Sequence, residues 1–250
     1  MDSGHIHTQV ENHIATITFS HQASNSFPSS LLQKLVEEIN QISAQDTVHV
    51  VVLQSEGKTF CAGASFDELL AIEDFETGKN FFSGFAHVIN AIRFSPKLFI
   101  ARVQGKAVGG GVGLIAACDM AFATPESAIK LSEIAIGIGP FVIEPVVSKK
   151  IGSMATAQLT LAPAEWKPAS WAFEKGLYNA IVSQEELNET VINKAKELAA
   201  YNPEALQEIK QLFWQNTSHW DTLLIERAAI SGRLVLSDFT KNALKQFKNK

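Results

Sequence analysis

GKAVGGGVG occupies residues 105–113, between an apolar stretch with β-branched residues at 98–103 and a second apolar stretch at 114–118. This order predicts a strand, then a glycine run, then a helix. Backbone amides at a glycine-rich helix N-terminus are unshielded, so they can bind an anion or an oxygen that is becoming one. The alternative reason for these glycines is tight packing of the helix against the strand.

Nucleotide-binding motifs do not explain the glycines. A dinucleotide fingerprint running through Gly109 and Gly111 would need glycine where Leu114 stands. A phosphate loop ending in Gly57-Lys58 would need glycine where Val52 stands. Both motifs therefore fail on their own spacing.

A second glycine segment, GKTFCAGASFDE, covers residues 57–68 and follows another β-branched run. Ser65 and Glu68 have the spacing of a capping box, which predicts that a helix starts here. The backbone amide of Ala64 then lies where the loop meets the helix. A capped helix after a turn, without further function, is the alternative.

The rest of the chain alternates between strand and helix patterns. Runs that are apolar on both faces, such as VVVL at 50–53, favour a buried and mainly parallel sheet covered by helices. Strands are predicted at 14–19, 48–53, 98–103, 120–123 and 180–182, and helices at 31–42, 81–92, 168–175, 185–200, 203–215 and 220–236. We therefore predict an α/β core in residues 1–190 and a C-terminal helical layer in residues 191–250.

Composition narrows the class of protein. The chain has 250 residues, 46% of them hydrophobic and 19% charged, with a net charge of −5, so neither a membrane-embedded protein nor a nucleic-acid binder is expected. Cys61 and Cys118 lack disulfide or zinc-site spacing, which predicts buried thiols and no metal. The N-terminus shows no export signal, and we expect a cytoplasmic protein.

Several segments together resemble the crotonase superfamily, the enoyl-CoA hydratases and isomerases. The resemblance covers nearly the whole chain. It rests on NSF at 25–27, FCAGA at 60–64, the run 105–119 ending in ACD, SEIAIG at 132–137 and KGL at 175–177. It implies a spiral of ββα units with a C-terminal helical region that builds trimers or hexamers, and an acyl-CoA substrate with no separate cofactor.

The resemblance also implies an active site. The thioester carbonyl would lie between the backbone amides of Ala64 and Gly110, which form an oxyanion hole for an enolate. Glu133 would be the general acid and base. Further substrate-binding residues implied by the resemblance are Ala62, Phe66, Gly109, Gly111 and Phe141.

One departure from the hydratases bears on the reaction. They use two glutamates, and the first falls on Gly113 in this chain. Glu133 stands alone in an apolar segment, where burial should raise the pKa of its carboxyl. Glu144 is the nearest spare carboxylate, and it is either a second acid or a structural residue.

A single carboxylate leaves the reaction open. Hydration must position a water and deliver a proton, whereas moving a double bond needs only one base. We weigh hydration and isomerisation almost equally. A thioester hydrolase or decarboxylase, or a catalytically silent acyl-CoA-binding protein, are the alternatives. Lys241, Lys245, Lys248 and Lys250 either contact CoA phosphates or are simply solvated.

Overall fold

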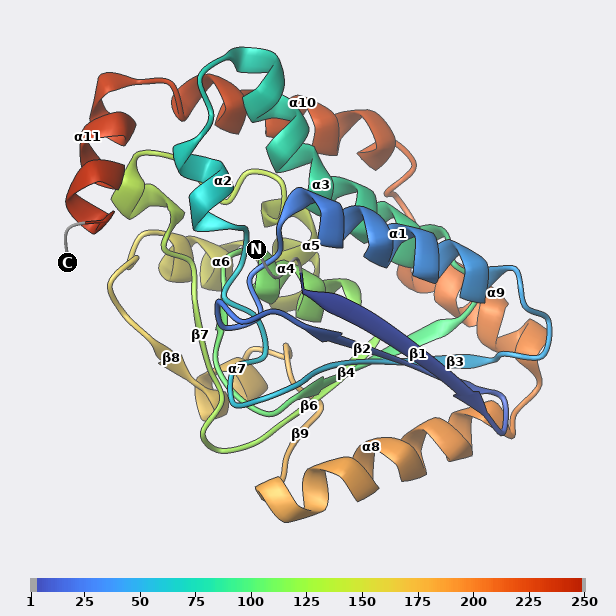
Figure 1. Cartoon of the computed structure of the whole chain (residues 1–250). Helices are drawn as coiled ribbons and strands as arrows, with labels where there is room; N and C mark the ends of the chain where they lie inside the picture. Colours follow the sequence, from blue (N-terminus) through green and yellow to red (C-terminus); the bar gives the residue numbers. More distant parts are fainter. Residues whose placement is uncertain (1–3, 249–250) are drawn as a thin grey trace.

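The larger sheet has the strand order β1-β2-β3-β4-β6-β9 in the computed structural model, which describes residues 4–248 (Figure 1). Its strands are β1 (His5–Glu11), β2 (Ile14–Ser20), β3 (Val50–Ser55), β4 (Leu98–Val103), β6 (Met120–Ala123) and β9 (Ala180–Ile181). β1 and β2 form an antiparallel hairpin, and the other neighbours are parallel. The mainly parallel sheet predicted from the sequence is therefore confirmed.

Helices bury both faces of this sheet (Figure 1). Val51 and Leu53 of β3 point into the main core beneath α1 (Ser29–Ser43) and α3 (Phe75–Phe94). Val50 and Val52 point the other way, into a cluster with Leu187 of α8 (Gln184–Ala199). Side chains alternate between the two faces of a strand. A strand whose two faces are both covered by helices therefore needs an uninterrupted run of apolar residues.

A small second sheet holds the glycine run. It contains β5 (Ala107–Val108), β7 (Ala128–Lys130) and β8 (Lys167–Pro168), with β7 in the middle. The chain leaves β5 at Gly109 and enters α4 (Gly110–Ala117) at once. β5 therefore fixes where the N-terminus of α4 lies.

The remaining helices complete the layers around the sheets (Figure 1). They are α2 (Phe66–Leu70), the short 3-10 helix η1 (Glu133–Ile136), α5 (Glu144–Ile151), α6 (Ser153–Thr160), α7 (Ala169–Glu174), α9 (Pro203–Phe213), α10 (Trp220–Leu234) and α11 (Asp238–Lys248). α10 packs along α3 at a pair of glycines, where a Cβ on Gly78 would lie 3.0 Å from the Cα of Gly232. α11 contacts η1.

The structure corrects several sequence predictions. α4 begins on Gly110 itself rather than at residue 114, and the last helices are two, α10 and α11, where one ending at 236 was expected. The second sheet was not predicted, because its strands are only two or three residues long. The spiral of ββα units, the trimeric assembly and the domain boundary at 190 stay predictions. Within residues 4–248, no helix combines the length and the apolar character that crossing a bilayer requires.

Candidate active site

The predicted site residues meet around one cavity of about 170 Å³. Its wall includes Ala62, Ala64, Phe66, Gly109, Gly110, Glu133 and Phe141. Gly111 is absent from the wall, because it faces Cys61 in the core, where a Cβ would lie 2.7 Å from the Cys61 carbonyl oxygen. An apolar cavity of roughly this volume can hold a molecule the size of benzene.

Hydrogen bonds on both sides of Ala64 hold its loop in place. The Phe27 amide donates to the carbonyl oxygen of Gly63 at 2.8 Å, and the Ser65 amide donates to the carbonyl oxygen of Phe27 at 2.9 Å. Gly63 has a φ of +89°, a conformation that favours glycine. No described residue accepts a hydrogen bond from the amide of Ala64, so this amide is free for a ligand.

The predicted helix start after Ala64 is confirmed, but the reciprocal half of the capping box is not. Ser65 caps α2 by accepting from the Glu68 amide at 3.3 Å. The Glu68 carboxylate instead accepts from the Ser29 hydroxyl at 2.6 Å and from the Ser29 amide. Glu68 thereby ties α2 to the start of α1.

The Gly110 amide lies at the N-terminus of α4, beside the Ala64 loop. Gly109 turns the chain with a φ of +52°, and its own amide donates to the carbonyl oxygen of Lys130 at 3.0 Å. A Cβ on Gly63 would lie 3.6 Å from the Gly110 nitrogen, which places the two segments side by side. Among the described residues the Gly110 amide has no acceptor, so two unpaired amides from different segments line one cavity.

Close neighbours explain why residues 109 and 110 are glycines. A Cβ on Gly110 would lie 2.2 Å from the ring of Phe85 on α3, and one on Gly109 would lie 2.7 Å from Glu133 Oε1. Neither neighbour leaves room for a methyl group. The glycine run therefore lets an aromatic ring and a carboxylate approach the backbone, in addition to exposing its amides.

Glu133 is the first residue of η1. The residue is partly exposed, yet its carboxylate atom Oε2 is buried and has no hydrogen-bond partner in the described structure. Burial raises the pKa of this carboxyl to about 7, and the nearby backbone amides of Glu133 and Ser132 oppose that shift. The predicted rise is confirmed, and near neutral pH the group can both accept and return a proton.

Most of the remaining wall is apolar. At the position of the missing glutamate, a Cβ on Gly113 would lie 2.5 Å from Cγ2 of Ile143, which fills the space. Glu133 is the one titratable side chain that lines the cavity within residues 4–248. The site thus combines two amide donors, one carboxylate and a lining that is apolar apart from Ser132 and Ser231.

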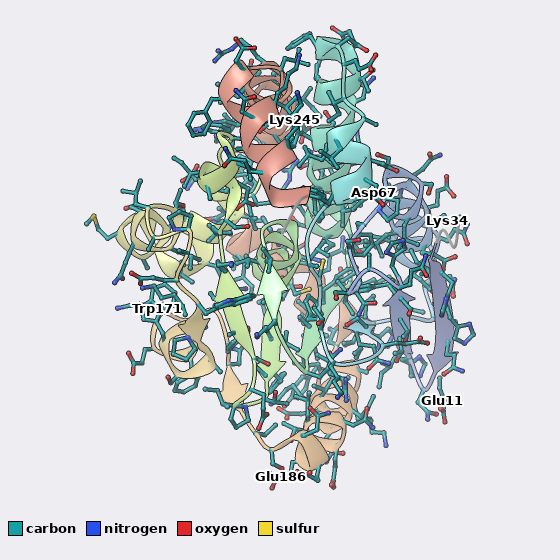
Figure 2. The ribbon with its side chains drawn as sticks, turned by 60° about the vertical axis from the view of Figure 1, so that its left-hand side comes forward. Glu11, Lys34, Asp67, Trp171, Glu186 and Lys245 are labelled. Carbon is teal, nitrogen blue, oxygen red and sulfur yellow. The ribbon has the colours of Figure 1, made fainter. Side chains whose placement is uncertain are left out.

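Glu144 and the C-terminal lysines lie outside this wall. The Glu144 carboxylate accepts from the Ser148 hydroxyl at 2.7 Å and lies 4.0 Å from Arg227, in keeping with a structural role. Lys241 and Lys245 are exposed on α11. Figure 2 shows Lys245 at the same end of the molecule as Asp67 of α2. The side chain of Lys248 and the whole of Lys250 lie outside the described structure. Both cysteines are buried free thiols, as expected.

Several lining residues carried no signal in the sequence. Ile143, the residue just before α5, is part of the wall, and so is Ser231 of α10. Phe81, Phe82 and Phe85 of α3 also line the cavity. Long-range packing of α3 and α10 brings these residues together. The periodicity of apolar residues along the sequence does not predict such packing.

Glutamine at position 133 should stabilise the fold at alkaline pH. The folded-state pKa of about 7 exceeds the ordinary value of 4.5, so the unsubstituted protein loses stability as pH rises through that window. The loss is at most about 3 kcal/mol. In urea unfolding, Glu133→Gln should therefore have a higher free energy of unfolding than the unsubstituted protein at about pH 8.5. This difference should shrink at about pH 5. An equal gain at both pH values would contradict the buried-carboxylate assignment.

Comparison with known proteins places this geometry in a family. The family model for enoyl-CoA hydratase/isomerase matches residues 9–248. Enoyl-CoA hydratase ACTT6 of Alternaria alternata is 31% identical over 68% of this chain, although that alignment spans only 55% of the relative. A Bacillus subtilis protein described as "Probable enoyl-CoA hydratase" is 27% identical over 96% of this chain and 94% of its own.

A solved structure agrees. The crystal structure of an enoyl-CoA hydratase from Mycobacterium avium superposes with a TM-score of 0.87 at 26% identity, covering 98% of this chain and 96% of that one. The α/β fold, the match along almost the full chain and these relatives agree with each other. The chain therefore belongs to the enoyl-CoA hydratase/isomerase family, within the crotonase superfamily.

Proposed function

We propose that this protein moves a double bond in acyl-CoA thioesters, converting a 3-enoyl-CoA into a 2-enoyl-CoA. The observation that carries the proposal is the lone carboxylate of Glu133 in a cavity with two unpaired backbone amides. Family membership supports an acyl-CoA substrate. CoA enters as part of that substrate, and the proposed chemistry requires no separate cofactor.

The reaction needs only these groups. The Glu133 carboxylate takes a proton from carbon 2 of the 3-enoyl thioester, and the C–H electrons move into the conjugated system and onto the thioester oxygen. The amides of Ala64 and Gly110 donate hydrogen bonds to that oxygen, which carries the charge of the dienolate. The same Glu133 then returns its proton to carbon 4, which leaves the double bond between carbons 2 and 3. Atoms and charge balance without a second acid or a water.

The apolar wall favours isomerisation over hydration. Adding water would require a group to orient and deprotonate it, and Ile143 fills the space beside Gly113 where that group would stand. Burial also raises the pKa of Glu133 toward neutrality, which suits a base that must accept and then release the same proton. Hydration therefore lacks the second catalytic group that it needs. Isomerisation does not need such a group.

Product analysis tests the proposal. The purified protein is offered a 3-enoyl-CoA and crotonyl-CoA, and the products are separated and weighed by mass spectrometry. We expect the 3-enoyl-CoA to give an isomer of unchanged mass, and crotonyl-CoA to gain water slowly or not at all. Faster hydration than isomerisation would contradict the proposal. Free CoA or carbon dioxide would indicate a hydrolase or decarboxylase, and tight binding without turnover would indicate a silent binding protein.

A further inference from the structure

Ser231 is an unusual polar residue in the apolar wall of the cavity. It lies on α10 and is 1% exposed. Its hydroxyl makes no hydrogen bond with any residue from 4 to 248. Ser132, another serine of the wall, is partly exposed, so water can satisfy it. The hydroxyl of Ser231 is not among the fully buried side-chain atoms that lack a partner, so the small accessible area of this residue lies at the hydroxyl, where the residue lines the cavity.

Other hydroxyls of the same chain show what a helix normally does with such a group. Ser83 on α3 donates to the carbonyl oxygen of Lys79 at 2.7 Å, and Thr156 on α6 donates to that of Gly152 at 3.0 Å. These bonds to the preceding turn are the usual solution for a helical hydroxyl that is out of water. Ser231 could bond the carbonyl oxygen of Arg227 in the same way, and it does not.

Packing explains why a small residue stands at 231 but not why it is a serine. The buried stripe of α10 includes Ala228, Ser231 and Gly232, where the helix crosses α3 at the close contact between Gly78 and Gly232. Alanine would meet the same steric demand. A hydroxyl in an apolar wall is costly unless it is hydrogen-bonded, so a polar group held in the cavity accounts for a serine at this position.

The surroundings of Ser231 show where that partner would lie. Leu69, Phe81 and Ile138 line the same cavity and belong to an apolar cluster that also contains Leu234 of α10 and Val235, which follows that helix. These side chains offer no hydrogen bond. The acyl group of a bound thioester would occupy this space, if the proposed function is right, because the amides and Glu133 engage its carbonyl end.

We propose that Ser231 is a specificity residue that hydrogen-bonds an oxygen on the acyl chain. The substrate class is then an acyl-CoA whose chain carries a hydroxyl or keto group, rather than a plain hydrocarbon chain. A serine hydroxyl both donates and accepts, so it suits either oxygen. This inference rests on the proposed use of the cavity for acyl-CoA, and it does not depend on which reaction Glu133 carries out.

Binding of ligands that cannot react tests the inference apart from catalysis. Saturated acyl-CoA thioesters are used in pairs of equal chain length, one plain and one with a hydroxyl at successive carbons beyond carbon 3, because a 3-hydroxyacyl thioester could lose water in the site. Affinities are measured by isothermal titration calorimetry. At one hydroxyl position we expect the oxygenated ligand to bind more tightly than its plain partner. Ser231→Ala should abolish that preference, changing the ratio of the two affinities roughly tenfold.

A matched serine serves as the control. Ser83→Ala removes a buried helix hydroxyl that already has a partner within its own helix, so it should leave the ratio of affinities unchanged. An unchanged ratio in Ser231→Ala, or no preference in the unsubstituted protein, would overturn the inference alone. If the preference exists but no thioester is turned over, the proposed isomerisation fails and the role of Ser231 stands. If no acyl-CoA binds, both fail.

Discussion

Replacing Glu133 by glutamine is expected to lower kcat for 3-enoyl-CoA isomerisation by roughly 10²- to 10⁴-fold, the usual contribution of a general acid or base. Glutamine keeps the size of the side chain but cannot take up a proton. KM should change little, because the thioester oxygen is held by the amides of Ala64 and Gly110. Steady-state kinetics on a 3-enoyl-CoA measures both quantities.

The pH dependence gives this prediction a second readout. Burial raises the pKa of Glu133 to about 7, and the base must be ionised to remove the first proton. In the unsubstituted protein kcat/KM should therefore rise with pH and level off above an inflection near that value. The residual activity of Glu133→Gln should lose this inflection.

Glu144→Gln is the matched control for Glu133. It removes a nearby carboxylate that lies outside the cavity wall and accepts from Ser148, so isomerisation should persist with the original pH profile. Full activity in Glu133→Gln would exclude the general-base role. A loss of similar size in Glu144→Gln would show that two carboxylates act together, and hydration would then be favoured over isomerisation.

The sequence predicted the parts of this site that local chemistry determines. Strand 98–103 is found at its predicted limits because a short, mostly apolar run that is buried on both faces has few other solutions. The rise in the pKa of Glu133 followed from its apolar neighbours in the chain. The resemblance of two glycine segments to a known family then predicted that the backbone amides of Ala64 and Gly110 bind one oxygen together.

What the sequence could not predict depends on distant contacts. Glycines are weak helix formers, so no periodicity indicated that α4 starts at Gly110, and the packing of the Phe85 ring on that residue is visible only in the fold. Ile143 enters the space beside Gly113 from another segment. Ser231 reaches the cavity only because α10 crosses α3 at two glycines. Each of these features depends on a tertiary contact between segments that are far apart in the sequence.

Alanine at position 110 should damage the oxyanion hole by displacing its backbone. The added Cβ would lie 2.2 Å from the Phe85 ring, so either the ring or the start of α4 must move. Loss of one oxyanion donor typically lowers kcat on the order of 10²- to 10³-fold. Overpacking of this kind should also lower the free energy of unfolding by about 1–3 kcal/mol, which urea unfolding measures.

Gly84→Ala separates the two effects of Gly110→Ala. Gly84 is on α3 next to Phe85, and its added Cβ would meet the tip of the Leu32 side chain, 2.7 Å away, rather than an aromatic ring. Leu32 can change its rotamer, so this variant should fold and keep its isomerase activity. If Gly110→Ala retained full kcat while losing stability, the Gly110 amide would have no part in holding the thioester oxygen. A large fall in kcat with an unchanged circular dichroism spectrum, together with full activity in Gly84→Ala, would instead show that the position of this one amide limits the rate.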